Sequence, residues 1–135
     1  MSDDQPTTAE QARRKALIID DESTIRSALR RYFTRKGWDV EEAADGAGGL
    51  HMLTEDAERF DIVLCDLRMP GFSGIDLHDE LVLANPQLLR RFVFSTGDVS
   101  SPEAASFVSR TRCQVLQKPF ELKALDTIIS GMQSV

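Results

Sequence analysis

Cysteine and histidine are scarce in this chain, and neither is arranged as a metal or redox centre. Cys65 and Cys113 each lie inside an apolar segment, without the spacing of metal-ligand pairs or of redox cysteines. His51 and His78 are isolated. We interpret both cysteines as small core residues, as is typical of a reducing compartment such as the cytoplasm, and both histidines as surface or boundary residues.

Two further absences narrow the class of protein. No apolar run approaches the ~20 residues of a membrane-spanning helix, and the polar N-terminus has no apolar segment of a secretory signal. Acidic residues number 22 against 16 basic ones, a net charge of -6, whereas nucleic-acid binding needs a concentrated basic surface. We therefore expect a cytoplasmic protein without membrane insertion or direct nucleic-acid binding, and one suited to cations.

The length of 135 residues is enough for one domain with one hydrophobic core, and the apolar content of 41% is that of a globular chain. Residues 1–14 are polar, and we expect them to form a flexible tail or linker. Residues 15–135 are expected to form the single folded domain.

Short apolar runs alternate with helical patterns along this domain. The expected strands are Ala16–Ile19, Asp39–Ala43, Ile62–Cys65, Phe92–Phe94 and Val115–Leu116. Helical spacing is found over residues 23–36, around 50–53, over 75–84, from 100 onward and over 122–132. The apolar stripes of the last two helices are Ala104, Phe107 and Val108, and then Leu122, Leu125, Ile128, Ile129 and Met132. The alternation predicts an α/β fold, a doubly wound five-stranded parallel sheet with five helices.

Four of the expected strands end on polar residues. These are Asp20 and Asp21 after the first strand, Asp66 after the third, Thr96 after the fourth and Lys118 after the fifth. In a doubly wound sheet, ligands bind at the carboxyl ends of the strands. A single aspartate at such a position often caps the next helix, but five polar groups at one edge are better explained by a shared site.

The residue types at this edge suit phosphoryl chemistry. Three neighbouring carboxylates repel one another unless a cation lies between them, and all-oxygen ligation suits Mg²⁺. The Pro/Gly turn after Asp66 is expected to leave that strand end exposed, so this carboxylate is the candidate nucleophile toward phosphorus. Mg²⁺, Lys118 and the Thr96 hydroxyl would then offset the charge of the transferred group.

The motifs IIDDE, CDLRMPGFSG, FSTGD and QKPF, in this order and at this spacing, resemble the receiver domains of two-component response regulators. The resemblance spans about residues 15–133. It implies a flavodoxin-like, CheY-like fold with strand order 2-1-3-4-5. It also implies a phosphoacceptor function in a phosphorelay.

The resemblance further implies a role for each residue at the edge. The phosphoacceptor would be Asp66, the switch hydroxyl Thr96 and the phosphoryl-contacting lysine Lys118. The Mg²⁺ ligands would be Asp21 and Asp66 directly, Asp20 mainly through water, and the main-chain carbonyl of Arg68.

The end of the fifth strand has one feature that follows the family and one that departs from it. The family suggests a cis peptide bond between Lys118 and Pro119. It usually has Phe, Tyr or His three residues before the lysine, where this chain has Val115. A coupled movement of the threonine and an aromatic ring is therefore not expected here.

Partners also follow from the resemblance. The phosphoryl donor would be a histidine kinase or a histidine phosphotransfer domain, and the chain would not be an enzyme, although it would dephosphorylate itself. The stretches STGDVSSPEA and QVLQKPF are most similar to receivers of hybrid sensor histidine kinases, so we expect such a receiver or a single-domain regulator. The basic residues of the first helix are either a solvated face or a docking face for an acidic partner; they are Arg26, Arg30, Arg31, Arg35 and Lys36.

Three alternatives fit parts of the pattern. A magnesium-dependent phosphatase of the haloacid dehalogenase type also forms an aspartyl-phosphate, but its D-x-D motif is absent from 66–68 and from 20–22. A non-phosphorylated pseudo-receiver that serves only as an interaction module would normally have lost one of the five site groups. A flavin-binding module would need a loop of Ser, Thr and Gly after the first strand, where this chain has acids.

Overall fold

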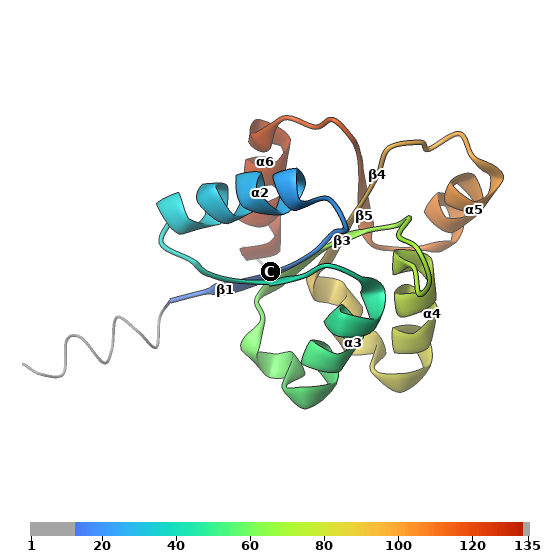
Figure 1. The fold of residues 1–135 in the computed structure, drawn as a ribbon, viewed down its shortest axis with the longest axis horizontal. Coiled ribbons are helices and arrows are strands. Elements are labelled where there is room, and N and C mark those ends of the chain that lie inside the picture. Colours follow the sequence, from blue (N-terminus) through green and yellow to red (C-terminus); the bar gives the residue numbers. More distant parts are fainter. Residues whose placement is uncertain (1–12, 134–135) are drawn as a thin grey trace, which may run out of the picture.

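The computed structural model describes residues 13–133 and shows a parallel sheet between two layers of helices (Figure 1). The strands are β1 (Lys15–Ile19), β2 (Asp39–Ala43), β3 (Ile62–Asp66), β4 (Phe92–Thr96) and β5 (Gln114–Gln117). Within the described residues every strand pairing is parallel, in the order β2-β1-β3-β4-β5. The predicted fold class and strand order are confirmed. The tail expected over residues 1–14 lies almost entirely outside the described residues, so that boundary stays a prediction.

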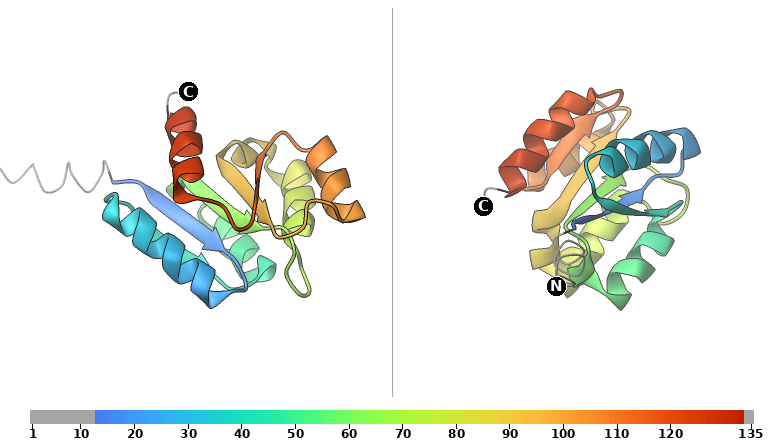
Figure 2. Two further views of the ribbon diagram at one scale, coloured as in Figure 1. Left: turned by 90° about the horizontal axis from the view of Figure 1, so that it is seen from above. Right: turned by 90° about the vertical axis from the view of Figure 1, so that its left-hand side faces the viewer.

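The helices divide between the two faces of the sheet. Among residues 13–133 the α-helices are α2 (Ser23–Arg35), α3 (Gly46–Glu55), α4 (Gly74–Ala84), α5 (Pro102–Arg110) and α6 (Leu122–Gln133), and two short 3₁₀ segments are η1 (Ala57–Arg59) and η2 (Pro86–Arg91). Helices α2 and α6 cover one face, and α3, α4 and α5 cover the other (Figures 1 and 2). The five predicted helices are present, whereas the 3₁₀ segments were not predicted. No helix of the described part is long and apolar enough to cross a membrane.

Strand position explains the difference between the fully apolar and the half-polar runs. The central strands β1 and β3 have helices on both faces, so both of their faces are buried and their sequences are nearly continuous apolar runs. The edge strands β2 and β5 are only partly buried, and their sequences, DVEEA and QVLQ, are correspondingly mixed. The two core clusters lie on opposite faces of this sheet.

The apolar stripes of α5 and α6 were predicted with one error each. Ala104 and Phe107 are buried, but Val108 is 43% exposed, because one further residue rotates the side chain by about 100° away from the sheet. Leu125 is fully buried, whereas Leu122 is 44% exposed, because it is the first residue of α6 and stands one turn before the first buried position. The other three residues of the α6 stripe are buried or partly buried.

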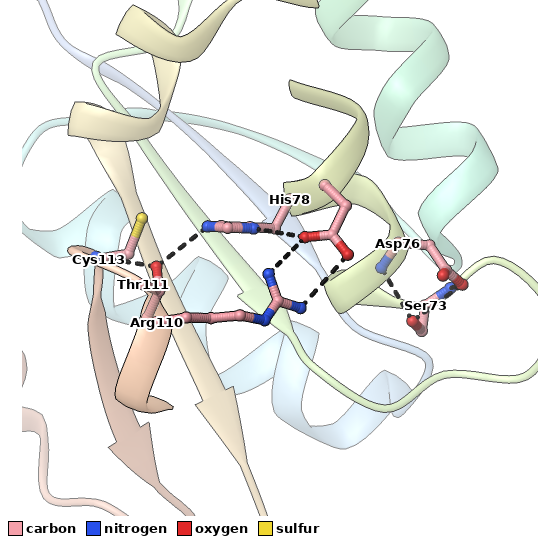
Figure 3. A network of polar contacts seen from close by, with 7 residues as sticks. Ser73, Asp76, His78, Arg110, Thr111 and Cys113 are labelled. Atoms are coloured by element: carbon pink, nitrogen blue, oxygen red, sulfur yellow. Dashed lines mark hydrogen bonds and ion pairs between the residues drawn. The ribbon is translucent and has the colours of Figure 1, made fainter. Parts of the chain in front are cut away.

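The interpretation of His78 as a surface or boundary residue was wrong. Its side chain on α4 is buried, with Nδ1 3.0 Å from a carboxylate oxygen of Asp79 and Nε2 3.1 Å from the Thr111 hydroxyl (Figure 3). Its ring packs edge-on against Phe107, at 4.7 Å between centroids, and Arg110 pairs with Asp79. Burial is tolerated because both ring nitrogens have partners. One partner, Asp79, is the next residue, whereas Thr111 is 33 residues away in sequence and follows α5.

Both cysteines and His51 agree with the prediction of core cysteines and a surface histidine. Cys65 is fully buried and Cys113 is half-buried against the same core cluster, and both are free thiols. His51 is exposed. Burial raises the pKa of both thiols, which keeps them protonated.

Gly74 sets how closely α4 approaches the end of β3. A Cβ atom at this position would lie 2.1 Å from the main-chain oxygen of Asp66 and 2.9 Å from the Cα of Leu67. The Gly74 N–H donates to the main-chain oxygen of Leu67 at 3.0 Å. Because the neighbouring atoms are backbone atoms, a side chain here cannot be accommodated without moving the end of the strand.

We predict that Gly74→Ala lowers the free energy of unfolding by about 2 kcal/mol or more, because the added methyl group overlaps backbone. The matched control is Gly131→Ala in α6, where no atom of another element lies within 4 Å of the added methyl group. That variant should be more stable than wild type by about 0.5–1 kcal/mol. Urea unfolding followed by circular dichroism measures both, and equal stability of the two variants would contradict the prediction.

Candidate functional site

Three carboxylates meet at the carboxyl edge of the sheet. Asp20, Asp21 and Asp66 each place a carboxylate oxygen within 4.8 Å of the others. Strands β1 and β3 are parallel neighbours with Ile19 opposite Cys65, so the residues that follow end at the same level. Asp20 and Asp66 are only 2% and 6% exposed, while Asp21 is exposed. The predicted convergence of the three acids is confirmed.

Local hydrogen bonds hold Asp20 at the end of β1. Its N–H donates to the main-chain oxygen of Ala43 at 3.1 Å, which continues the pairing of β1 with β2 by one residue. One of its carboxylate oxygens accepts the N–H of Glu22 at 2.9 Å. These bonds turn the chain out of the sheet and into α2, and they leave Asp21 at the mouth of the site.

The expectation that the Asp66 strand end would be exposed was wrong. The chain does leave β3 through the predicted turn, which contains Gly71 in the left-handed region at φ 77°. However, the Leu67 N–H continues the β3–β4 pairing by donating to the main-chain oxygen of Ser95 at 2.8 Å. The Asp66 side chain therefore stays in the row of strand ends, where Lys118 partly covers it.

Lys118 is the cation of the site. Its Nζ atom lies 2.8 Å from Asp20, 3.3 Å from Glu22 and 3.5 Å from Asp66, and its side chain is 13% exposed. Its N–H donates to the main-chain oxygen of Thr96 at 2.7 Å. The predicted cis bond to Pro119 is present. The contact with Glu22 was missed, and the signal for it was the third acid of the DDE motif.

Thr96 ends β4 and is fully buried. Its hydroxyl oxygen accepts the N–H of Asp98 at 3.2 Å. Because that bond uses a lone pair, the hydroxyl proton stays available for donation to another group. Val115, in place of the usual aromatic residue, is partly buried and packs against the core cluster on the α3, α4 and α5 face.

The site holds more acidic than basic side chains, and burial and these charges shift the pKa values of Asp66 and Lys118. The pKa of Asp66 is raised to about 6, mainly by burial; the charge of Lys118 opposes this shift and the charge of Asp20 adds to it. Burial also acts to lower the pKa of Lys118, but the hydrogen bond to Asp20 and the charge of Asp66 outweigh it, so the net shift is upward. Lys118 is therefore charged near neutral pH. The carboxylates of Asp20, Glu22 and Asp66 all lie within 3.5 Å of its ammonium group.

Arg68 follows the acceptor by two residues. Its main-chain N–H bonds to the Asp66 carboxylate, which lowers the pKa of that carboxyl. Its exposed guanidinium lies 3.9 Å from Glu103 on α5. The side chain thus points along the surface, and the expected use of the main-chain carbonyl as a metal ligand stays a prediction.

Comparison with known proteins places this geometry in a family. The family model "Response regulator receiver domain" matches residues 16–130. The sensor kinase CckA of Brucella abortus is 32% identical over 116 residues, which are 86% of this chain and 12% of that protein. The chain therefore spans about an eighth of the length of this relative.

Solved structures agree. A response regulator receiver domain protein from Clostridium thermocellum superposes with a TM-score of 0.76 at 28% identity, over 88% of this chain and 93% of that one. The receiver domain of the hybrid histidine kinase CckA gives a TM-score of 0.69 at 26% identity, over 87% and 97%. Together with the strand order and the cluster of carboxylates, these matches show that the chain belongs to the response regulator receiver domain family of two-component signalling.

Proposed function

We propose that this chain accepts a phosphoryl group on Asp66, in the presence of Mg²⁺, from a histidine kinase or a histidine phosphotransfer domain. The observation that carries the proposal is the meeting of three carboxylates and one largely buried ammonium group at a single sheet edge. We further propose that it is a cytoplasmic receiver that is part of a hybrid kinase or stands alone; its similarity to a sensor kinase and to a phosphotransferase supports the two arrangements.

The residues present fit Mg²⁺. All-oxygen ligation by one or two carboxylates plus waters is what this ion prefers. Both oxygens of Asp20 are already engaged, one by the N–H of Glu22 and the other by Lys118. We therefore assign direct ligation to Asp21, Asp66 and the Arg68 carbonyl, with Asp20 acting through water. When bound, the ion would neutralise the carboxylates and attract the phosphoryl oxygens.

The remaining chemistry is carried by this chain's own side chains. A carboxylate oxygen of Asp66 attacks phosphorus, the phosphorus–nitrogen bond of a phosphohistidine breaks, and the leaving imidazole nitrogen takes up a proton. Lys118 is 3.5 Å from Asp66 and needs only a small movement to contact the new phosphoryl oxygens. The Thr96 hydroxyl still has its proton to donate to them.

The alternatives fit the geometry less well. A phosphatase of the haloacid dehalogenase type needs an acid two residues after the nucleophile, where this chain has the exposed Arg68. A pure interaction module has no use for two buried carboxylates around a lysine, because such an arrangement costs stability. We therefore propose a phosphoacceptor that is not an enzyme toward other substrates.

The basic face of α2 is smaller than its sequence indicated. Arg26 and Arg30 both bind Glu42 on β2, and Lys36 pairs with Asp126 on α6. These three cations are therefore partly neutralised within the chain. A docking face for an acidic partner would rest mainly on the two exposed arginines that remain, Arg31 and Arg35.

Incubation with acetyl phosphate and Mg²⁺ should give a hydroxylamine-labile adduct of one phosphoryl group, because Asp66 alone combines a strand end, a following Pro/Gly turn and neighbouring acids. Asp66→Asn should abolish the adduct in intact-protein mass spectrometry. The matched control, Asp39→Asn, changes an exposed aspartate at the other end of β2 and should label normally. Labelling of Asp66→Asn would show that the acceptor is another residue.

Binding of Mg²⁺ should depend more on Asp21 than on Asp20. Loss of a direct ligand removes a bond to the metal, whereas a water-mediated ligand can be partly replaced by solvent. A titration with Mg²⁺ followed by NMR should therefore show a larger loss of affinity in Asp21→Ala than in Asp20→Ala. Equal losses would count against this assignment.

The raised pKa of Asp66 predicts a pH-dependent stability without metal. The pKa is about 6 in the folded protein and about 3.9 unfolded, so the native state binds the proton more tightly. Stability therefore falls as pH rises through this window. In EDTA, the free energy of unfolding of Asp66→Asn should exceed that of wild type by about 1–2 kcal/mol at pH 7.5. This difference should shrink toward pH 4.5. A gain independent of pH in urea unfolding would refute the charge explanation.

A further inference from the structure

Arg26 reaches from the first turn of α2 to the loop that carries the acids. Its Nη1 atom donates to the main-chain oxygen of Asp20 at 2.7 Å, and its Nε atom donates to a carboxylate oxygen of Glu42 at 3.0 Å. The side chain is 19% exposed. Arg26 therefore connects the end of β1 to β2 through a largely buried, charge-assisted pair of hydrogen bonds.

The oxygen that Arg26 binds belongs to the peptide unit between Asp20 and Asp21. That unit is planar, so holding its oxygen also fixes the direction in which the chain enters Asp21. The other side of Asp20 is held by the bond from its N–H to the main-chain oxygen of Ala43. Asp20 is thus fixed to the end of β2 on both sides, directly on one and through Arg26 and Glu42 on the other.

The start of α2 lacks a capping side chain, and besides Arg26 two bonds hold the loop before it: the Glu22 N–H donates to the Asp20 carboxylate, and Lys118 donates to the Glu22 carboxylate. The residue before the helix is Glu22, whose side chain makes no capping hydrogen bond in the described structure, and no acidic residue lies in the first turn. A helix normally gains stability from such groups at its start. Here the bond from Arg26 stabilises the start of α2, because it joins the first turn of the helix to the loop before it.

Glu42 gives Arg26 a fixed anchor. Its two carboxylate oxygens are bound by different arginines, Arg26 and Arg30, and its side chain is 26% exposed. The hydrogen bond from Arg30 is the largest cause of a lowered pKa for this carboxyl, so Glu42 stays charged. Arg30 also donates to the main-chain oxygen of Val40 at 3.4 Å, and within the described residues it makes no hydrogen bond to Asp20.

We propose that Arg26 is a positioning residue of the Mg²⁺ site, and that through the Asp20 carbonyl it sets the place of the Asp21 carboxylate. The inference rests on the proposed function, because it assigns the metal to these acids. It assigns no contact between Arg26 and the metal or the phosphoryl group.

Charge and position predict opposite results when Arg26 is removed. A guanidinium near a cation site repels the cation, so its loss alone should tighten Mg²⁺ binding. Loss of the restraint on Asp21 should instead weaken Mg²⁺ binding, because the Asp21 carboxylate must then be ordered when the metal binds. A role limited to fold stability should leave the affinity of the folded protein unchanged.

The experiment is a Mg²⁺ titration by NMR of wild type, Arg26→Met and Arg30→Met. We expect the Mg²⁺ dissociation constant of Arg26→Met to rise about three- to tenfold, the range of one lost hydrogen bond. Arg30→Met is the matched control, since it removes an equal charge from Glu42 without touching Asp20, and its affinity should stay within about twofold of wild type. An unchanged or tighter Mg²⁺ affinity in Arg26→Met would overturn the inference.

A second measurement distinguishes weaker Mg²⁺ binding from a slower phosphorylation of Asp66. The initial rate of labelling by acetyl phosphate in Arg26→Met should fall at low Mg²⁺ and return to within about twofold of wild type at saturating Mg²⁺. A rate that stays low at saturating Mg²⁺ would contradict a role through metal placement alone. Arg26→Lys keeps the charge but has a single donor group, so its affinity should lie between wild type and Arg26→Met.

The outcomes distinguish this inference from the proposed function. Wild-type binding of Mg²⁺ and labelling of Asp66, with Arg26→Met and Arg26→Lys both behaving like wild type, would overturn the inference alone. Absence of Mg²⁺ binding and of labelling in wild type would overturn both. If Arg26→Met fails to fold, as judged by circular dichroism, the result of Arg26→Lys decides.

Discussion

Repulsion between like charges at one sheet edge is the constraint on which this structure depends. Asp20 and Asp66 are nearly buried beside each other, and burial of a carboxylate is unfavourable even without a charged neighbour. Lys118 lies within 3.5 Å of both, and it is the cation that allows the two to coexist. One ammonium group does not balance three carboxylates, so the metal-free site keeps a surplus of negative charge. The protein accepts this loss of stability at its functional edge.

Parallel topology explains why only short segments need to be specified for the site. The chain returns to the same edge at the end of every strand, so residues almost a hundred positions apart become neighbours without a long loop. Backbone bonds at Asp20, Leu67 and Lys118 extend three of the four strand pairings by one residue and hold the site residues in register. The helices have a supporting role, and Gly74 shows how close that support is, since α4 begins in contact with the backbone of Asp66.

Much of the fold and the site could be predicted because both follow from local patterns. Apolar runs and helical periods give the order of elements, and a polar residue after a buried run marks a strand end. What could not be predicted depends on partners distant in sequence. His78 is buried because Thr111 and Phe107 surround it, and Arg26 belongs to the site loop because Glu42 anchors it. The sequence alone places Arg26 on a basic face that is either solvated or a docking face, because its charge is visible in the sequence and its contacts are not.

The loop after β4 offers a route by which a change at Asp66 could reach the surface without an aromatic ring at Val115. The Thr96 hydroxyl already accepts the N–H of Asp98, and the Asp98 carboxylate in turn accepts both the N–H and the hydroxyl of Ser100. The next residue, Ser101, caps α5. On the proposed function, donation of the threonine proton to a phosphoryl group would act first on this chain of short-range bonds. The start of α5 would respond to this change, because successive hydrogen bonds join it to the hydroxyl and no aromatic ring is needed at Val115.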